Sequence, residues 1–304
     1  MSGRGTDGAA ESIRHRLRNE LRARGEDVTL GLQRYAVERL LYRLGRSKLR
    51  ERFILKGATL FAIWGTTYRP TRDIDFTGYG SSDPDALIRD FREICNTADD
   101  VDQLTFDADT ITTEPIRDGS EYPGLRIRIR ARLGESDIPI QVDVGFGNAI
   151  VPGPEETEYR TILGDPPPRI LAYPRESVVA EKLNAMVTLG DRNSRYKDFY
   201  DLYAMAGAFA FDRNTLVRAV RATFVRRATP MAADFPVALT APFFASEARQ
   251  SQWRAYVSRN MLSGAPSDFS QVGDLLTRFL QPVWEDLRLE EERTGDWPPA
   301  GPWR

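Results

Sequence analysis

Two carboxylates, Asp73 and Asp75, stand two residues apart within a short apolar stretch. Side chains of a β-strand alternate between its faces, so both acids project from one face while Ile74 and Phe76 point into the core. Two carboxylates this close repel each other and share a proton unless a cation lies between them. Because carboxylate and phosphate oxygens suit Mg²⁺, the pair predicts a magnesium site. The alternative is a strand end that carries two solvated acids.

Two further stretches complete the predicted site. Asp143 alternates with apolar residues in a predicted strand over 138–146, so it is either a third metal-binding carboxylate or a surface acid. The run Lys56-Gly57-Ala58-Thr59 separates a predicted strand (53–55) from a predicted helix (58–64). Backbone N–H groups in such a turn can receive a phosphate, although a glycine at this place can also be only a turn.

The second half of the chain adds a cation and another acid. Lys182 lies in a predicted helix over 175–189 and is a compact positive charge that can contact nucleotide phosphates. Arg195 and Asp198 stand at the start of the next predicted helix, over 196–211. The alternative for these residues is ordinary ion pairing on a helix surface.

Four arginines share one face of a predicted strand over 125–133: Arg126, Arg128, Arg130 and Arg132. A basic stripe of this kind can follow the phosphate backbone of RNA. It is equally compatible with a solvated strand face or with a docking surface for an acidic partner.

The composition bounds the function. The 304 residues are 41% hydrophobic and 28% charged with a net charge of −2, as in a soluble globular protein without a strong overall field. One cysteine excludes a disulfide framework, and a single histidine nearly excludes histidine-rich metal sites and Ser-His-Asp triads. No apolar run approaches membrane-spanning length, so we expect a cytoplasmic protein that does not bind membranes.

The periodicity predicts two domains between two tails. A disordered tail covers 1–10, and a domain of interleaved helices and strands, α/β or α+β around one sheet, covers 11–165. The proline-rich stretch 164–168 marks its end. A helical domain follows over 170–293, with helices expected at 175–189, 196–211, 213–227, 245–261 and 268–290. The last residues, 294–304, are expected to be irregular.

With these residues in place, the sequence resembles the AbiEii/AbiGii nucleotidyltransferase toxins of type IV toxin–antitoxin and abortive-infection systems, which include the MenT-like proteins. The resemblance runs in order over about 25–290. The stretches that carry it are 38–44, 53–57, 72–76, 122–124, 142–147, 180–183 and 193–202. One departure is Ala58, which stands where these proteins commonly have a second glycine or a serine.

The resemblance implies an α+β fold: a polymerase-β-like nucleotidyltransferase core, with a mixed sheet and flanking helices, plus a C-terminal helical domain that faces it across a cleft. It implies Mg²⁺ as cofactor and an NTP as substrate. It also implies an RNA acceptor, at the 3′ end of tRNA, whose blockage stops translation, and a cognate antitoxin of winged-helix type. The catalytic residues that it implies are Asp73, Asp75, Lys182 and Asp198, with Lys182 and Arg195 contacting the nucleotide.

Two other classes of function stay open. The same core can carry a kinase-like phosphotransferase or a nucleotidyltransferase for a small molecule. An inactive relative would instead only bind RNA or an antitoxin. Transfer of label from the α-phosphate or from the γ-phosphate of an NTP distinguishes nucleotidyl transfer from kinase activity.

Overall fold

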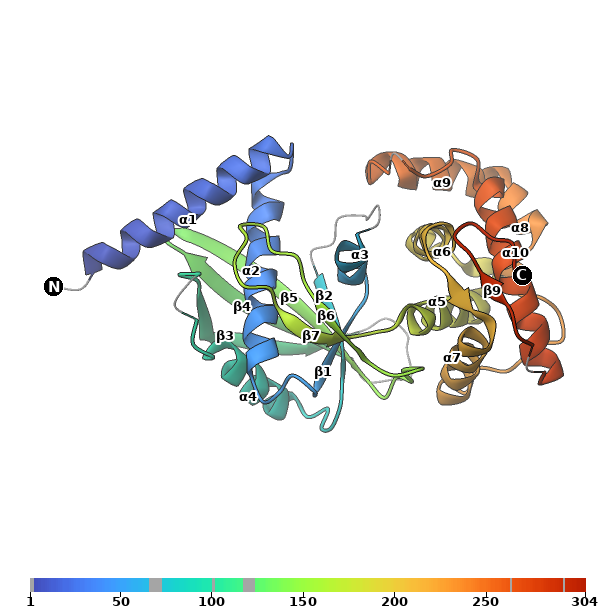
Figure 1. Ribbon diagram of the computed structural model, residues 1–304, viewed down its shortest axis with the longest axis horizontal. Coiled ribbons are helices and arrows are strands. Elements are labelled where there is room, and N and C mark those ends of the chain that lie inside the picture. Colours follow the sequence, from blue (N-terminus) through green and yellow to red (C-terminus); the bar gives the residue numbers. More distant parts are fainter. Residues whose placement is uncertain (1–2, 66–72, 100–101, 117–123, 263, 292) are drawn as a thin grey trace. The chain divides into compact units, whose positions relative to one another are not determined.

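The computed structural model describes residues 3–65, 73–99, 102–116, 124–262, 264–291 and 293–304 (Figure 1). The chain divides into two compact units. The first is built from Met1–Gly65, Thr71–Gly147 and Glu155–Ala172, and the second includes Asn148–Pro154 and Tyr173–Arg304. The change from the first unit to the second at Ala172 lies close to the domain boundary predicted around the proline-rich stretch.

The first unit is built on one seven-stranded mixed sheet with the strand order β3-β4-β5-β2-β1-β7-β6. Strand β2 pairs in parallel with β5, and β1 with β7, while the other neighbours are antiparallel. The strands are β1 (Phe53–Lys56), β2 (Asp73–Gly78), β3 (Thr105–Pro115), β4 (Gly124–Leu133), β5 (Ser136–Phe146), β6 (Glu155–Glu158) and β7 (Arg169–Ala172). Its helices are α1 (Gly3–Ala23), α2 (Val28–Arg46), α3 (Thr59–Trp64) and α4 (Pro84–Cys95).

The sheet has one apolar face because its strands alternate. Every second residue of β4 and β5 is buried, as for Ile127 and Val142, while the residues between them are polar and more exposed. Helix α4 packs on the apolar face, where the ring of Phe91 lies 5.1 Å from that of Phe53. The opposite face therefore keeps the charged side chains, including both members of the Asp73–Asp75 pair.

Helix α2 is held to this unit by buried ion pairs. Arg43 donates to Asp102 at 2.5 Å, and Arg39 donates to Asp99 at 2.6 Å. The guanidinium of Arg43 also lies 4.7 Å from the centre of the Phe106 ring. Buried charges need partners of this kind, and these pairs fix the position of α2 relative to the sheet.

The second unit is mainly helical. Its helices are α5 (Arg175–Leu189), η1 (Gly190–Arg192), α6 (Tyr196–Ala208), α7 (Arg213–Arg226), η2 (Val237–Leu239), α8 (Ala241–Ala245), α9 (Glu247–Arg259) and α10 (Phe269–Leu289). Aromatic rings fill its core. The centre of the Phe269 ring lies 5.3 Å from that of Phe199 and 4.8 Å from that of Phe244. A two-stranded sheet joins β8 (Phe211–Asp212) to β9 (Asp296–Trp297). No described helix is long and apolar enough to cross a membrane.

The α+β fold with a mixed sheet and a helical second part is confirmed, and the predicted elements that surround the site lie where they were expected. The tails differ from the prediction. Helix α1 begins at Gly3, so 3–10 is helical. The C-terminal stretch is ordered because its tryptophans are packed: Trp297 is fully buried and donates to the carbonyl of Ala206, and Trp303 donates to that of Phe279.

Candidate functional site

The pairing register brings the predicted site residues of the first unit into one row across the sheet. In the strand order β1, β2, β5, β4 and β3, this row consists of Lys56, Asp75, Asp143, Arg126 and Glu114. Residues directly opposite each other on neighbouring strands project from the same face. The row therefore alternates a cation, two acids, a cation and an acid on the polar face. We call it the charged row.

A second row lies two residues along the same strands and therefore on the same face. It consists of Asp73, Gln141, Arg128 and Thr112, on β2, β5, β4 and β3. Asp73 and Asp75 thus stand at corresponding places in two neighbouring rows, and both are partly buried. The strand alternation predicted for the pair is confirmed.

Gly57 lies directly against the Asp75 carboxylate. Its φ of +76° is in the left-handed region, and a Cβ added there would stand 2.1 Å from Oδ2 of Asp75. Only glycine meets both requirements without a shift of its surroundings. The turn continues through Ala58 into Thr59, the first residue of α3. The turn predicted to contact phosphates is therefore next to the acidic pair.

Asp143 is engaged by an arginine. Nε and Nη2 of Arg126 donate to its two carboxylate oxygens at 2.9 and 2.8 Å. This bond, with added attraction from Asp143 and Asp73, raises the pKa of Arg126 above its ordinary value, although burial opposes the rise. The third predicted metal-binding carboxylate thus has its charge offset by a guanidinium on the neighbouring strand.

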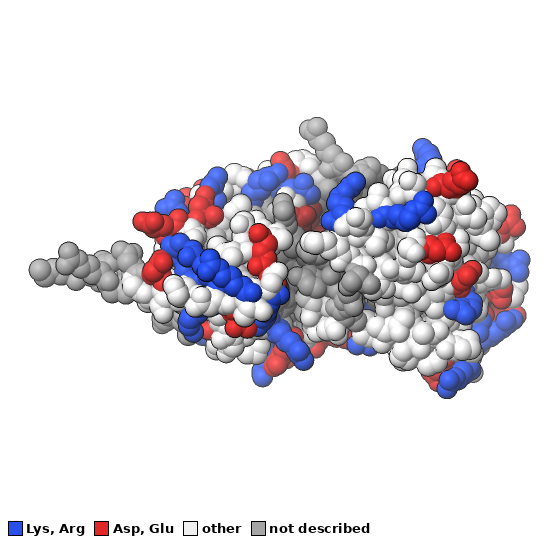
Figure 2. Space-filling view, turned by 90° about the horizontal axis from the view of Figure 1, so that it is seen from above, with Lys and Arg blue, Asp and Glu red and all other residues white. Residues whose placement is uncertain are grey.

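The other arginines of β4 are also balanced by acids. Arg128 pairs with Glu114 at 2.7 Å, and Arg130 pairs with Asp137, while Arg132 is exposed on the same strand. Basic and acidic side chains likewise lie interspersed on the face of the molecule shown in Figure 2. The predicted basic stripe exists as a row of side chains, but acidic partners offset the charge of three of its four members.

Among the described residues of the first unit, the β2 pair offers the donor chemistry that suits a metal ion. Within the part of the chain that the structure describes, no group of three or more Asp, Glu, His and Cys side chains lies close enough together to hold an ion. Asp73 and Asp75 supply carboxylate oxygens from one face, which is the donor chemistry that Mg²⁺ prefers. It usually binds through one or two carboxylates, with substrate phosphates and water filling the remaining positions.

The second unit holds Lys182 in a compact ion cluster. Its Nζ donates to Asp198 at 2.9 Å and to Asp201 at 2.7 Å, and Nε of Arg195 lies 2.8 Å from the other oxygen of Asp198. The side chains of Lys182, Asp198 and Asp201 are 15%, 3% and 2% exposed. Asp201 is the member that the predicted site omitted. Its spacing of three from Asp198, which puts both on one helix face, was the signal for it.

Electrostatics fix the protonation of this cluster. Burial, the largest influence, lowers the pKa of Lys182, but attraction from Asp198 and Asp201 outweighs it and raises the pKa above its ordinary value. Burial also raises the pKa of Asp198, yet Lys182 and Arg195 hold it below its usual range. Lys182 is therefore positively charged at neutral pH, which suits charge neutralisation better than proton transfer.

The predicted site residues thus form two groups. Lys56, Gly57, Asp73, Asp75 and Asp143 lie together in the first unit, and Lys182, Arg195 and Asp198 lie together in the second. Three residues of the wider motif pattern, Arg72, Tyr122 and Pro123, fall outside the described residues.

Comparison with known proteins identifies the family. The sequence profile of the family described as "Nucleotidyl transferase AbiEii toxin, Type IV TA system" matches residues 39–275. A crystal structure of an H. pylori protein, described as a candidate nucleotidyltransferase, is similar over 84% of this chain and 94% of that one, with 13% identity and a TM-score of 0.45. JHP933 from Helicobacter pylori is similar over 83% and 90%, with 14% identity and a TM-score of 0.44. No curated protein matches significantly.

Gly57→Ala should reduce the free energy of unfolding by about 1–3 kcal/mol more than Gly25→Ala does. Both glycines have a positive φ, +76° and +66°, but a Cβ at Gly25 meets nothing within 4 Å. The control therefore carries the backbone strain without the clash against Asp75. Urea unfolding of the two variants and the parent measures the difference. Equal losses for the two variants would contradict the close contact between Gly57 and Asp75.

Lys182→Met should destabilise the protein at pH 7 by about 3–5 kcal/mol, because it removes the cation that two buried carboxylates share and leaves Asp198 with Arg195 alone. Without Lys182, burial raises the pKa of these acids in the folded state, so the variant gains stability as the pH falls and they take up protons. In the parent, the low pKa of Asp198 means that its contribution is lost as the pH falls. The stability gap should therefore narrow toward pH 4.

Chemical unfolding across this pH range tests the prediction, with Lys197→Met as the matched control. Lys197 is an exposed lysine in the first turn of α6, so its loss should change the unfolding free energy by no more than about 0.5 kcal/mol. A gap between the Lys182 variant and the parent that stays constant with pH would show that the cluster is not held by charge.

Proposed function

The chain belongs to the AbiEii family of nucleotidyltransferase toxins of type IV toxin–antitoxin systems, and we propose that it transfers a nucleoside monophosphate from an NTP to RNA. The observation that carries this proposal is that Lys56 of the charged row lies beside Asp75 on the neighbouring strand, with the Gly57 turn against the Asp75 carboxylate and Asp73 two residues away. A triphosphate needs cations and backbone donors, and the acidic pair supplies ligands for the Mg²⁺ that accompanies it.

In the proposed reaction, the oxygen of an acceptor hydroxyl forms a bond to the α-phosphorus of the NTP. The bond from that phosphorus to the oxygen bridging it to the β-phosphate breaks, and pyrophosphate leaves with the electron pair. The hydroxyl proton passes to solvent or to a carboxylate. Such transfers demand little covalent chemistry from a protein, so positioning and charge neutralisation carry the catalysis.

Residue roles follow from this requirement. Asp73 and Asp75 would hold Mg²⁺, which when bound neutralises charge on the triphosphate. Lys56 and the backbone of Gly57 to Thr59 bind phosphate oxygens next to this pair. Arg126 holds Asp143 in place, so that Asp143 supports the site through Arg126 instead of as a third ligand.

In the second unit, Lys182 and Arg195 supply positive charge to the nucleotide. Asp198 accepts a hydrogen bond from Lys182 and is ion-paired with Arg195, so it suits the positioning of Lys182 better than the acceptance of a proton. The family resemblance implies nucleotide contacts for Lys182 and Arg195 and a catalytic role for Asp198.

The toxin family supports a more specific acceptor and partner. We propose that the acceptor is the 3′ end of tRNA, that its modification blocks translation in the cytoplasm, and that an antitoxin of winged-helix type restrains the enzyme. The offset of three β4 arginines by acids argues that recognition of RNA depends on local contacts rather than on a broad basic surface.

The test is incubation of the purified protein with total tRNA, Mg²⁺ and each α-labelled NTP in turn. Label should enter RNA with at least one nucleotide. Asp75→Asn should reduce the rate on the order of 100-fold or more, because it removes half of the acidic pair. Asp85→Asn, an exposed acid in the first turn of α4, is the matched control and should leave the rate unchanged.

Failure of every NTP to label RNA would overturn the RNA acceptor. Transfer of γ-phosphate label to protein or to a small molecule would instead establish the kinase-like alternative on the same core. RNA labelling that survives Asp75→Asn unchanged would show that the acidic pair is not the catalytic site.

A further inference from the structure

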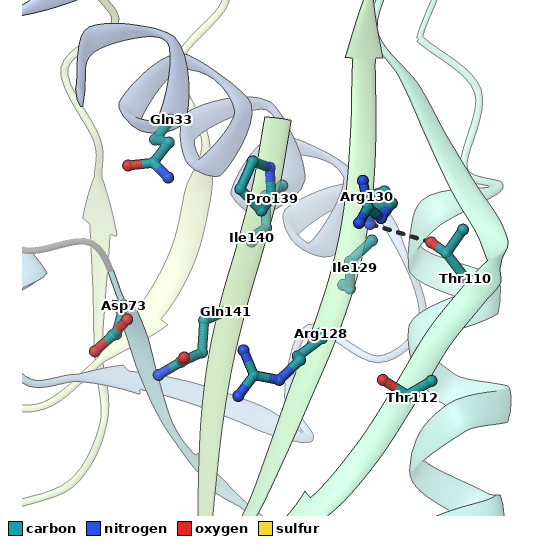
Figure 3. Close-up of a pocket in the computed structure, with 10 residues that line it drawn as sticks. All are labelled: Gln33, Asp73, Thr110, Thr112, Arg128, Ile129, Arg130, Pro139, Ile140 and Gln141. Carbon is teal, nitrogen blue, oxygen red and sulfur yellow. Dashed lines mark hydrogen bonds between the residues drawn. The ribbon is translucent and has the colours of Figure 1, made fainter. Parts of the chain in front are cut away.

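A pocket of about 460 Å³ opens beside the first residue of β2 in the first unit (Figure 3). Four neighbouring strands and the N-terminal part of α2 line it. The lining residues that matter here are Gln33, Asp73, Thr112, Arg128 and Gln141. Four of these five form the second cross-strand row, so the pocket lies along that row with Asp73 at one end.

Two side-chain amides of the lining offer hydrogen bonds that no described residue uses. Among the described residues, neither Gln33 nor Gln141 has a hydrogen-bond partner for its side-chain amide. A glutamine amide donates and accepts at once, which is the complement of a nucleobase edge or a ribose hydroxyl. Arg128 adds a guanidinium whose partner, Glu114, is half exposed and can be exchanged for a phosphate. Pro139 contributes an apolar surface beside them.

The size of the pocket limits its occupant. A volume of about 460 Å³ lies in the range of small-molecule sites, which is roughly 300–1,000 Å³. One nucleotide fits this range, whereas an RNA duplex requires an extended surface. The polar lining also disfavours an apolar acceptor, because the amides and the guanidinium would then lose water without gaining partners.

The place of the pocket distinguishes the two substrates, and this step rests on the proposed function. Lys56 and the Gly57 turn, which contact phosphates in that proposal, lie on the β1 side of the acidic pair. The pocket lies on the opposite, β5 side. In an in-line displacement the attacking and leaving oxygens stand on opposite sides of the phosphorus. With the leaving pyrophosphate on the β1 side, the attacking hydroxyl comes from the pocket.

We propose that this pocket holds the terminal nucleotide of the RNA acceptor, with its ribose hydroxyl directed toward Asp73. Gln33 and Gln141 read the base or the ribose of this nucleotide, and Arg128 binds its phosphate. A free mononucleotide has the same chemistry as an RNA end, so the experiment compares the two sources directly.

The experiment measures binding and kinetics separately. Fluorescence anisotropy of a short single-stranded RNA with a free 3′ hydroxyl reports binding in the absence of NTP. Steady-state kinetics with the same RNA then give KM for the RNA and KM for the NTP. The variants are Gln33→Leu and Gln141→Leu, which keep the side-chain size and remove the amide. Gln271→Leu, at an exposed position on α10, is the matched control, and thermal unfolding checks that all variants fold.

Each pocket variant should weaken RNA binding and raise KM for RNA about tenfold, the effect of losing one or two good hydrogen bonds, with KM for the NTP unchanged. Gln271→Leu should leave both constants unchanged. A raised KM for the NTP with unchanged RNA binding would overturn the proposal and assign the pocket to the base of the NTP. A mononucleotide that binds as tightly as the RNA would overturn the RNA assignment in favour of a free nucleotide.

Failure of the inference is distinguishable from failure of the proposed function. If the parent protein labels RNA but the pocket variants behave like Gln271→Leu, the transferase stands and the pocket assignment falls. If the parent protein binds RNA through these glutamines but transfers no label, the pocket stands as an RNA site and the proposed reaction falls.

Discussion

The structure of the site depends on one electrostatic constraint: two carboxylates, Asp75 and Asp143, are paired directly across neighbouring parallel strands. Like charges at directly opposed positions of a sheet are destabilising. The fold offsets them from both sides, with Lys56 opposite Asp75 on β1 and Arg126 opposite Asp143 on β4. The result is a row of charges in which each acid has a cation beside it, next to a second acid, Asp73, on the same strand.

The acids of the site have different surroundings, and this gives them different expected roles. Both oxygens of Asp143 are bonded to Arg126, so its charge is largely offset within the protein. The β2 pair lies between two features: the turn at Gly57 lies against Asp75, and Asp73 lines the pocket along the second row. The sheet thus presents Lys56 and the Gly57 turn, which we propose bind phosphate, on one side of Asp73 and Asp75, and the hydrogen-bonding groups of the pocket on the other. A transferase that brings two substrates together needs this separation.

Much of the site could be predicted from the sequence because strand alternation is local. The period of two puts Asp73 with Asp75, and Gln141 with Asp143, on one face. The pairing of Arg126 with Asp143 could also be predicted from the sequence. Gly134 and Glu135 form a two-residue hairpin turn with Leu133 opposite Ser136, and counting back from that turn places Arg126 opposite Asp143. Considered without its partner strand, β4 predicts only a basic stripe that includes Arg126.

Other features depend on tertiary contacts and left no local signal. The parallel pairing of β2 with β5 joins segments more than sixty residues apart, and nothing in either strand specifies the other. Gln33 reaches the pocket only because buried ion pairs fix α2 against the sheet. The strand β6 is rich in glutamate and shows no apolar alternation, so its pattern did not predict a strand. The C-terminal tail is ordered through Trp297, whose burial depends on α10.

The central claim is that the β2 pair, and not Asp143, forms the cation site. Mn²⁺ binding followed by electron paramagnetic resonance tests it most directly, in the parent protein, in Asp75→Asn, and in the double variant Arg126→Gln with Asp143→Asn. The double variant removes one positive and one negative charge together and leaves the local net charge unchanged. The account predicts that the double variant binds Mn²⁺ like the parent protein, while Asp75→Asn loses binding. Loss of binding in the double variant as complete as in Asp75→Asn would contradict the account and restore Asp143 as a metal ligand.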